Sequence, residues 1–427
     1  MRVNAVAVAA TVALAVIAGP ADRARGQPAA GVTVYEGARL IVGNGSAPIE
    51  DATLVVEGAR ITQAGRTADI RIPAGAARVN LAGKTVMPTI VDTHVHPSHT
   101  RDALALDLMR RAYYGVSAMM SLGQDDSGDL LALREETVPG RARYFSSGRG
   151  ITSPLPGCSE APYWITTEAD GRKAVQELAA QKVDIVKIFV DDWAPRKHKK
   201  LTPAVYGALI DEAHSRGLRV TAHMRELEDA KALLRAGVDA FAHSVRDKDI
   251  DEEGLALFKQ RANLVVNPNL PDRGVKTDLS WLRASMSPAE MATLEERNVD
   301  NPQRHAVFAI QARNTAKLSA AGIRLVLGTD GNRPYGPHEE MADLVTAGMT
   351  PMQVIVAATR NSAEFLRMAD AGTLEAGKSA DFIVLDANPL DDITNTRRIS
   401  SVVLRGTAVD RGPGRGGGVH EGSALCR

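Results

Sequence analysis

The stretch that decides the fold is Thr85-Val-Met-Pro-Thr-Ile-Val-Asp-Thr-His-Val-His96, an apolar, β-branched run that ends in two histidines. A short run of this composition predicts a buried strand. His94 and His96 are two residues apart, so in a strand both side chains project to the same face, as two ligands of one metal ion must. The stretch therefore predicts a buried strand with a metal site at its end.

Similar runs recur along the chain after this one. Each is short, apolar and rich in β-branched residues, and helix-compatible sequence separates most neighbours. This alternation is typical of repeated βα units that build a parallel sheet. Eight such runs predict an α/β fold, a TIM-like (β/α)8 barrel over residues 85–368. The runs are Thr85–His96, Ser117–Gly123, Ala142–Gly148, Asp184–Asp191, Arg219–Met224, Ala240–Val245, Asn263–Asn269 and Arg324–Asp330.

The stretches between the runs predict helices. Apolar residues recur at helical spacing over Pro203–Arg216 and Glu226–Ala236, and a glycine that can end a helix follows each. The interval from Leu270 to Ile323 is longer than one crossover needs. We expect an extra helix or an active-site lid there.

The two ends of the chain have strand character without helices. In residues 30–84, short strand-like runs flank a turn at Asn44-Gly45, and strand character returns in residues 369–411. We expect these two segments to form one small β-sandwich domain beside the barrel. Residues 412–427 begin with a glycine-rich run that cannot pack, and this predicts a disordered tail.

The composition favours small-molecule chemistry. The chain has 427 residues with 44% hydrophobic content, and 51 Lys plus Arg balance 51 Asp plus Glu. It therefore has no overall field that would draw it to nucleic acid or to an anionic membrane. A small-molecule substrate is the expected partner, and a homo-oligomer is compatible with the sequence.

The N-terminus predicts export. A basic residue at Arg2 precedes an apolar run from Ala5 to Ala18, which is too short for a stable membrane anchor and has the layout of a signal peptide. We assign residues 1–26 to it and expect a periplasmic or secreted protein. The two cysteines, Cys158 and Cys426, lie far apart in sequence, so we expect no disulfide framework and a passive loop thiol at Cys158.

Further polar side chains lie where other predicted strands end. Functional residues of a (β/α)8 barrel gather at that edge. Taken singly, each histidine could be a hydrogen-bonded structural residue, and a lysine in an apolar run could pair with a nearby aspartate. Taken together at the ends of separate strands, they predict one site. These residues are Lys187, His223, His243 and Asp330, which join His94 and His96.

The ordered set resembles a known family. The segments are Met87–His96, Val186-Lys187-Ile188, Thr221-Ala-His223, Ala242-His243, Gly328-Thr-Asp330 and the closing segment Gly372–Leu385. Together they look like the amidohydrolase superfamily of metal-dependent hydrolases, near its imidazolonepropionase-like and prolidase-like branch, which includes Xaa-Pro and Xaa-Arg dipeptidase-like enzymes. The resemblance covers nearly the whole chain after the signal peptide.

The resemblance implies a centre of two zinc ions. His94, His96 and Asp330 would hold one ion, His223 and His243 the other, and a carboxylated Lys187 would bridge them. Zinc lowers the pKa of bound water toward neutrality, which supplies a hydroxide nucleophile. Asp330 would orient that hydroxide and carry its proton to the leaving group. A centre with one metal, as in imidazolonepropionases, is the alternative, and iron or manganese also suits these ligands.

The substrate is less constrained by the sequence. Arg225, two residues after His223, could clamp a carboxylate, and an ion pair with Glu226 or Glu228 is its ordinary alternative. A carboxylate anchor favours dipeptides or N-acyl amino acids, cleaved at the amide C–N bond. Three further candidates for substrate contacts are Tyr163, Trp164 and His338.

Other functions compete with amide hydrolysis. A lactonase, a cyclic amidohydrolase or a deaminase could use the same residues. A non-catalytic, exported metal- or solute-binding protein is the alternative outside enzymes. Asp330 discriminates, because metal storage does not need a carboxylate beside an open coordination site whereas hydrolysis does.

Overall fold

The computed structural model describes residues 31–412 and 414–417. The predicted signal peptide 1–26 lies outside the described residues, as do residue 413 and residues 418–427 of the predicted tail. Among the described residues, no helix has the length and apolar character needed to cross a membrane.

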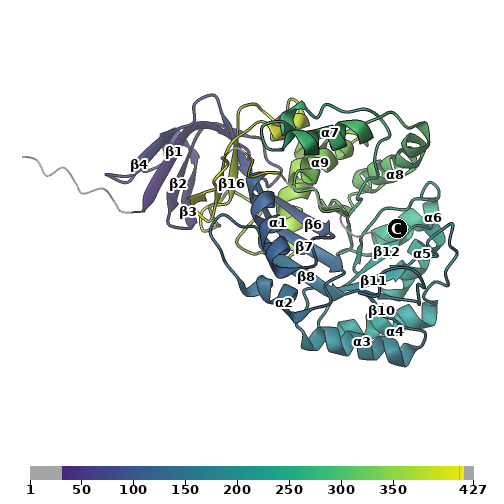
Figure 1. Cartoon of the computed structure of the whole chain (residues 1–427). Coiled ribbons are helices and arrows are strands. Elements are labelled where there is room, and N and C mark those ends of the chain that lie inside the picture. The colour runs from purple at the N-terminus through teal and green to yellow at the C-terminus, as the bar shows by residue number, and fades with distance from the viewer. Residues whose placement is uncertain (1–30, 413, 418–427) are drawn as a thin grey trace, which may run out of the picture.

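Segments near the two ends of the described chain, Val32–Pro88 and Phe382–Ala408, form one mixed sheet, drawn in purple and yellow in Figure 1. Its strand order is β18-β17-β16-β5-β1-β2-β3, with β4 paired to β1, and Val86 of β5 lies opposite Val384 of β16. The predicted union of the N- and C-terminal segments is therefore present, whereas a two-layered sandwich stays a prediction. The strands are β1 (Val32–Leu40), β2 (Ile49–Glu57), β3 (Arg60–Arg66), β4 (Ala77–Asn80), β5 (Thr85–Pro88), β16 (Phe382–Leu385), β17 (Ile399–Leu404) and β18 (Thr407–Ala408).

The predicted first strand, Thr85–His96, is two strands in two sheets. β5 ends at Pro88, and β6 (Ile90–Val95) pairs instead with β7 (Val116–Gly123). A proline has no N–H for a strand ladder, which favours a break at this point. The prediction of one continuous strand is therefore wrong, and β6, which contains His94, directly follows a strand of the sheet formed by the N- and C-terminal segments.

The remaining strands form two parallel sheets. One has the order β6-β7-β8 and the other β10-β9-β11-β12-β13-β14-β15. Backbone hydrogen bonds from Asp184 N to Ser146 O and from Thr93 N to Leu327 O link the two sheets at both ends. Seven of the eight predicted runs thus contain one observed strand. The further strands are β8 (Arg143–Arg149), β9 (Ile151–Thr152), β10 (Tyr163–Trp164), β11 (Val186–Val190), β12 (Val220–Met224), β13 (Ala240–Phe241), β14 (Val265–Val266) and β15 (Arg324–Leu325).

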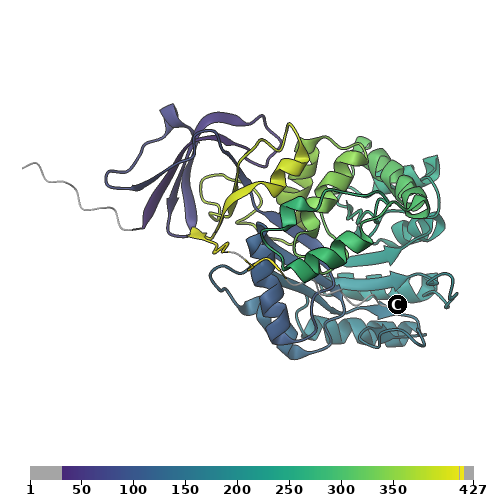
Figure 2. The same ribbon diagram turned by 45° about the horizontal axis from the view of Figure 1, so that its top comes forward.

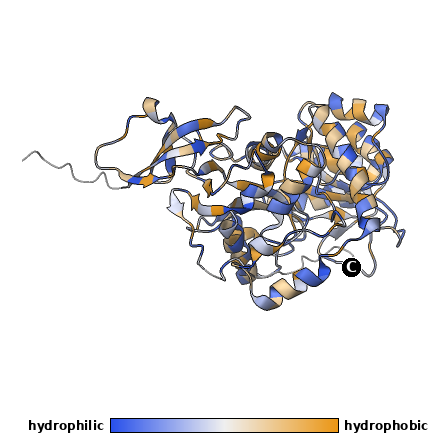
Figure 3. Cartoon of the chain, turned by 90° about the horizontal axis from the view of Figure 1, so that it is seen from above, coloured by the Kyte–Doolittle hydropathy of each residue, from blue (hydrophilic) through white to orange (hydrophobic). Residues whose placement is uncertain are grey.

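Helices flank these sheets, and their apolar faces pack inward (Figures 1 and 2). Apolar and polar residues alternate along them, as the hydropathy colours show (Figure 3). The predicted helices are present as α4 and α5, and Gly237 ends α5 with a φ of 96°. The longer helices are α1 (Arg101–Tyr113), α3 (Glu168–Ala180), α4 (Pro203–Ser215), α5 (Leu227–Ala236), α6 (Glu252–Gln260), α7 (Pro288–Arg297), α8 (Pro302–Ala320) and α9 (Gly336–Thr346), and the shorter ones are α2 (Gly128–Ala132), α10 (Pro351–Val356) and α11 (Ser362–Phe365).

Two further expectations concern single segments. The interval from Leu270 to Ile323 contains α7 and α8, so the predicted extra helix is present. Cys158 is part of a disulfide, so the prediction of a passive loop thiol is wrong.

Candidate metal centre

Three of the predicted ligands converge at the strand ends. The ligand atoms of His94, His243 and Asp330 all lie within 4.8 Å of one another. Asp330 is central: its Oδ1 lies 3.2 Å from His94 Nε2 and 3.0 Å from His96 Nε2, and its Oδ2 lies 3.7 Å from His243 Nε2. The end of β6, the loop after β13 and the loop after β15 therefore build one cluster.

The electrostatics of the cluster favour metal binding. Burial, and then the charge of Lys187, lower the pKa of His94 well below its usual value, and burial with Arg246 does the same for His243. Burial would raise the pKa of Asp330, but the neighbouring histidines hold it well below its usual range. Neutral imidazoles beside an ionised carboxylate are the protonation states that bind a divalent ion.

Asn269 orients the ring of His94. His94 Nδ1 lies 3.0 Å from Asn269 Oδ1 and 3.2 Å from the carbonyl oxygen of Ala242, so this nitrogen carries the proton and donates it. The lone pair then stays on Nε2, the atom that faces Asp330. Asn269 has a φ of 43°, and such a left-handed conformation in a non-glycine residue is typical of functional sites.

His223 is held by two neighbours that follow β11. Its Nε2 donates to Asp191 Oδ2 at 2.8 Å, and its ring stacks on Trp193 with centroids 5.0 Å apart. Its centroid lies 4.6 Å from that of the His243 ring. Because Nε2 is committed to Asp191, Nδ1 is the nitrogen that remains for a metal ion.

Lys187 reaches the site from β11 without a polar partner. Its side chain is fully buried, its Nζ has no hydrogen-bond partner among the described residues, and Nζ lies 5.0 Å from the ring centroid of Phe189. Burial lowers the pKa of Lys187 from 10.5 to about 7. A large fraction of this amine is therefore uncharged at neutral pH.

The buried ion pair of Asp92 and Arg111 stabilises the backbone segments that carry the cluster. Asp92 accepts a hydrogen bond from Arg111 Nη1 at 2.8 Å and another from Thr329 Oγ1 at 2.9 Å. The backbone N–H of Asp330 donates to the carbonyl oxygen of His94 at 2.8 Å. These contacts fix the end of β6 against the loop that carries Asp330.

Two glycines leave the space that the site needs. A Cβ at Gly328 would lie 2.1 Å from Asn267 Nδ2 and 2.8 Å from His94 Cβ. A Cβ at Gly123, where φ is 101°, would press on Phe189 at 3.0 Å and on Lys187 at 3.2 Å. Larger residues at either position would displace a ligand or the lysine.

The arginine and aromatic candidates differ in their placement. Arg225 is half-buried and forms no ion pair with any residue in the described part of the chain, while Glu226 and Glu228 pair with lysines. Trp164 packs in an apolar cluster with Phe189, which lies beside His223.

Two candidates do not face the centre. Tyr163 lies under the guanidinium of Arg149, 4.1 Å from its ring centroid, and its hydroxyl bonds to Glu177 of α3. His338 is fully buried, with Nε2 donating to Tyr114 O at 2.9 Å and Nδ1 3.1 Å from Thr396 Oγ1. The predictions of substrate contacts at Tyr163 and His338 are corrected, because neighbouring strand residues face opposite sides and the His338 ring has no free nitrogen.

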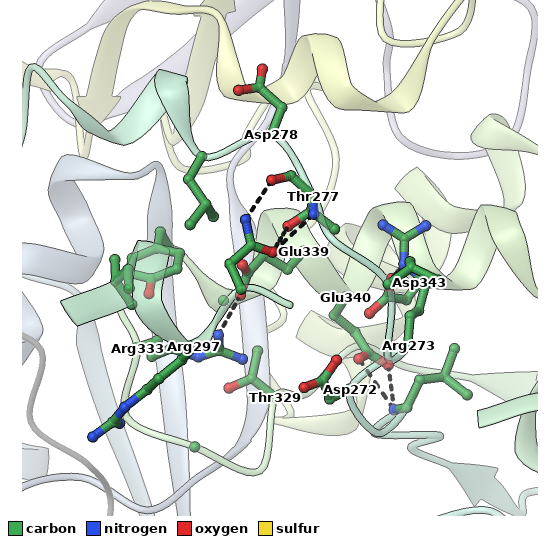
Figure 4. Close-up of a pocket in the computed structure, with 18 of the residues that line it drawn as sticks. Asp272, Arg273, Thr277, Asp278, Arg297, Thr329, Arg333, Glu339, Glu340 and Asp343 are labelled. Carbon is green, nitrogen blue, oxygen red and sulfur yellow. Dashed lines mark hydrogen bonds and ion pairs between the residues drawn. The ribbon is translucent and has the colours of Figure 1, made fainter. Parts of the chain in front are cut away.

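A cavity opens beside the cluster, between the segment after β14 and the start of α9 (Figure 4). Its volume is about 730 Å³, and Thr329 and Gly331, the two neighbours of Asp330, are part of its wall. Glu340 lines it and accepts a hydrogen bond from Leu270 N at 3.1 Å. The cavity therefore adjoins the candidate ligands directly.

Sequence reasoning missed the residues that orient the ligands. Asp191 and Asn269 end predicted strands, and Trp193 and Arg246 follow predicted strands, but none belongs to a ligand motif. Their position at strand ends was the available signal.

The donor set fits a divalent metal. His94 Nε2, His96 Nδ1 and Lys187 Nζ are buried atoms without a hydrogen-bond partner among the described residues. Buried polar atoms are nearly always paired, so three unpaired nitrogens in one place indicate that the site binds a group outside the chain.

Comparison with known proteins gives a consistent picture. The profile described as "Amidohydrolase family" matches residues 85–409. The chain is 24% identical to an ochratoxinase of Aspergillus niger, over 90% of this chain and 88% of the relative. It is 25% identical to an imidazolonepropionase of Shouchella clausii, over 79% of this chain and 80% of the relative. The crystal structure of a Xaa-Pro dipeptidase with bound methionine superposes with a TM-score of 0.69 at 21% identity, covering 88% of this chain and 99% of the other.

Proposed function

Because the chain belongs to the amidohydrolase family, we propose that its strand-end site hydrolyses the amide C–N bond of a dipeptide or an N-acyl amino acid. The resemblance inferred from the sequence is confirmed, and the chain is a hydrolase of this family. The observation that carries the proposal is the convergence of His94, His243 and Asp330 beside the unpaired amine of Lys187.

We propose that the ligands divide between two zinc ions. His94, His96 and Asp330 hold one ion, and His223 and His243 hold the other. The lowered pKa values of His94, His223 and His243 and the unpaired nitrogens described above support this assignment, and iron or manganese suits the same ligands. A bound ion of this kind makes hydroxide available near neutral pH and polarises a carbonyl group.

Lys187 joins the two halves of the proposed centre as a carbamate. Its uncharged amine attacks the carbon of carbon dioxide, a new N–C bond forms, and the nitrogen releases a proton. The product is an anion with two oxygens, which an ammonium group cannot offer to a metal. The support is the burial of Lys187, its lack of a hydrogen-bond partner and its lowered pKa.

Asp330 handles the proton in the proposed reaction. Its carboxylate is held between the His94 and His243 rings, and it is ionised because its pKa is low. It accepts a proton from the attacking water and delivers that proton to the leaving nitrogen. Such a carboxylate beside the ligands favours hydrolysis over metal storage or solute binding.

The substrate class rests on Arg225 and Trp164. The guanidinium of Arg225 has no ion-pair partner in the described part of the chain and can bind the carboxylate of an amino acid leaving group. Trp164 adds an apolar surface to the cluster of Phe189, whose ring lies beside His223. Lactones and cyclic amides, which lack a carboxylate, are the second candidates, and a deaminase is the third.

Metal content tests the centre. Purified protein should hold close to two metal ions per chain by elemental analysis. Lys187→Ala should lower this number and abolish most turnover. One ion per chain in the wild-type protein, together with full activity of Lys187→Ala, would remove the bridge from the proposal.

A substrate screen tests the reaction. The zinc-loaded enzyme is compared with Arg225→Ala on dipeptides, N-acyl amino acids and lactones. We expect cleavage of carboxylate-bearing amides by the wild type and a loss confined to them in the variant. Turnover of lactones alone would replace amide hydrolysis by the second candidate.

We also propose that the two parallel sheets close into a (β/α)8 barrel, with residues 30–84 and 369–411 as a β-sandwich beside it. The hydrogen bonds between Thr93 and Leu327 and between Asp184 and Ser146 support closure. An experimental structure would show a gap between β6 and β15 if this were wrong.

Export is part of the proposal. The apolar N-terminal run and the disulfide at Cys158 support it, because disulfides persist in oxidising compartments. N-terminal sequencing of protein from the periplasm or the medium should give a start near residue 27. An intact Met1 in protein confined to the cytoplasm would contradict export.

A further inference from the structure

Two arginines follow the histidines of β12 and β13. Arg225 comes two residues after His223, and Arg246 comes three residues after His243. The backbone N–H of Arg246 donates to the carbonyl oxygen of Arg225 at 2.8 Å, which holds the two loops together. Both arginines therefore belong to the same sector of the site.

Arg246 lacks an anionic partner. Within residues 31–412 and 414–417, no carboxylate oxygen lies within 4.0 Å of its guanidinium, and its buried Nε has no hydrogen-bond partner. The guanidinium of Arg246 is half-buried, and with neither a carboxylate nor a partner for Nε among the described residues it can accept an anion from outside the chain.

The contact that Arg246 does make cannot survive metal binding. Its Nη2 donates to His243 Nδ1, which must then carry a lone pair. A neutral histidine that binds a metal through Nε2 has its proton on Nδ1, so two donors would face each other. If Nδ1 bound the metal instead, it could not accept the hydrogen bond either. In both cases Arg246 is released to another acceptor.

We propose that Arg246 and Arg225 together bind the carboxylate of the substrate, while the acyl group on the other side of the scissile amide occupies the cavity beside Asp330. This inference rests on the proposed amide hydrolysis and adds which residues select the substrate. It makes Arg246 a specificity-determining residue and orients the substrate across the strand ends.

The order of the strands supports this orientation. In the sheet, β12 and β13 are followed by β14 and β15. The arginines follow the first two strands, and the cavity lies beyond the last two, where Leu270 and Thr329 line it. His243 follows the same strand as Arg246, and Asp330 is the neighbour of Thr329 in the cavity wall, so an amide bond held by these two ligands can reach the arginines with one end and the cavity with the other.

The cavity walls favour an uncharged, bulky acyl group. Two arginines of the wall are paired, Arg273 with Asp343 at 2.8 Å and Arg333 with Glu339 at 3.0 Å (Figure 4), and Arg397 lies over the ring of Trp281. Trp281 adds an aromatic surface. A volume of about 730 Å³ is in the range that holds drug-sized molecules and exceeds the needs of an acetyl group. The predicted class is therefore N-acyl amino acids with an aromatic or long acyl group.

The clamp is tested with substrate pairs that differ in one group. N-acyl amino acids are compared with their α-carboxamides on zinc-loaded wild type, Arg246→Met and the control Arg313→Met, an exposed arginine of α8. We expect wild type and control to prefer the carboxylate by roughly 10- to 100-fold in kcat/KM, and Arg246→Met to lose this preference. An equal fall in kcat/KM for both substrates in Arg246→Met, especially with lower metal content, would show that Arg246 only supports His243. That result would overturn the clamp.

The cavity is tested by filling it. Val275 lines the cavity and is 37% exposed, while Val307 on α8 is 47% exposed and outside it. Val275→Trp should lower kcat/KM for a naphthoyl amino acid about tenfold or more while sparing the N-acetyl analogue, and Val307→Trp should affect neither. Equal effects on both substrates would overturn the acyl assignment.

A binding measurement separates this proposal from the proposed function. N-naphthylmethyl amino acids have no amide bond, so calorimetry reports their binding without turnover. If the wild type binds the carboxylate form tightly and Arg246→Met does not, the clamp is supported even if no amide is cleaved. Cleavage of amides with no discrimination between carboxylate and carboxamide would keep the reaction and overturn the clamp.

Discussion

Arg111 Nη1 lies 2.8 Å from Asp92 Oδ2, and neither side chain exposes any surface. Asp92 also accepts the hydroxyl and backbone N–H of Thr329, the residue before Asp330. Burial raises the pKa of Asp92, and Arg111 opposes this. The pair therefore joins the strand that carries His94 to the loop that carries Asp330.

Breaking this pair should destabilise the fold. Arg111→Met leaves an unpaired buried carboxylate, and we expect a loss of about 3–5 kcal/mol in the free energy of unfolding. Chemical denaturation measures it. The double variant Asp92→Asn, Arg111→Met should recover part of the loss, and a loss below about 1 kcal/mol in the single variant would mean that the pair contributes little.

Removing the side chain of Asn269 should weaken metal binding. Asn269→Gly keeps the left-handed backbone but frees His94 Nδ1, and we expect the metal affinity to fall about 10- to 100-fold. Competition with a chelator measures the affinity, and the exposed Asn80→Gly on β4 serves as the control. Unchanged affinity in Asn269→Gly would show that Ala242 O alone orients the ring.

The metal-free protein should gain stability as the pH rises above neutrality. The pKa of Lys187 is about 7 in the folded state and 10.5 ordinarily, so between these values the unfolded chain binds a proton that the folded chain does not. Stability should rise by up to about 1.4 kcal/mol per pH unit in this window. Unfolding in chelator and carbon dioxide-free buffer measures it. Lys187→Met should flatten the slope, and an equal slope in both proteins would contradict the prediction.

His338 should affect acid stability and not substrate binding. Burial lowers the pKa of His338 from 6.5 to about 4, so between these values only the unfolded chain takes up the proton, and stability falls as the pH drops through this window. His338→Gln removes this titration and should reduce the acid sensitivity of unfolding. Its KM should equal that of the wild type. A large rise in KM would restore His338 as a substrate contact.

The features of this protein that could be predicted are those that a short stretch of sequence encodes by itself. β-branched runs between amphipathic stretches indicate the parallel strands, and two histidines two residues apart in a strand share a face whatever the rest of the chain does. The ligand positions needed only this periodicity and the rule that strand ends meet. His94, His243 and Asp330 meet as those signals indicated.

The parts that failed depend on contacts between distant segments. Nothing in Thr85–His96 itself shows that its first half pairs with β16 and its second half with β7. The identity of His338 as a core residue depends on Thr396 and Tyr114, which approach it only after folding. Asn269 and Arg246 are ordinary loop residues until His94 and His243 are placed beside them.

The pairing of Val86 with Val384 also sets the order in which the molecule can assemble. β5 directly precedes the strand of the first ligands, yet its partner β16 is synthesised only after every parallel strand. Native pairing between such distant segments is slow because the intervening chain must first be brought together. The protein therefore cannot complete this sheet while its C-terminal segment is still in the ribosome.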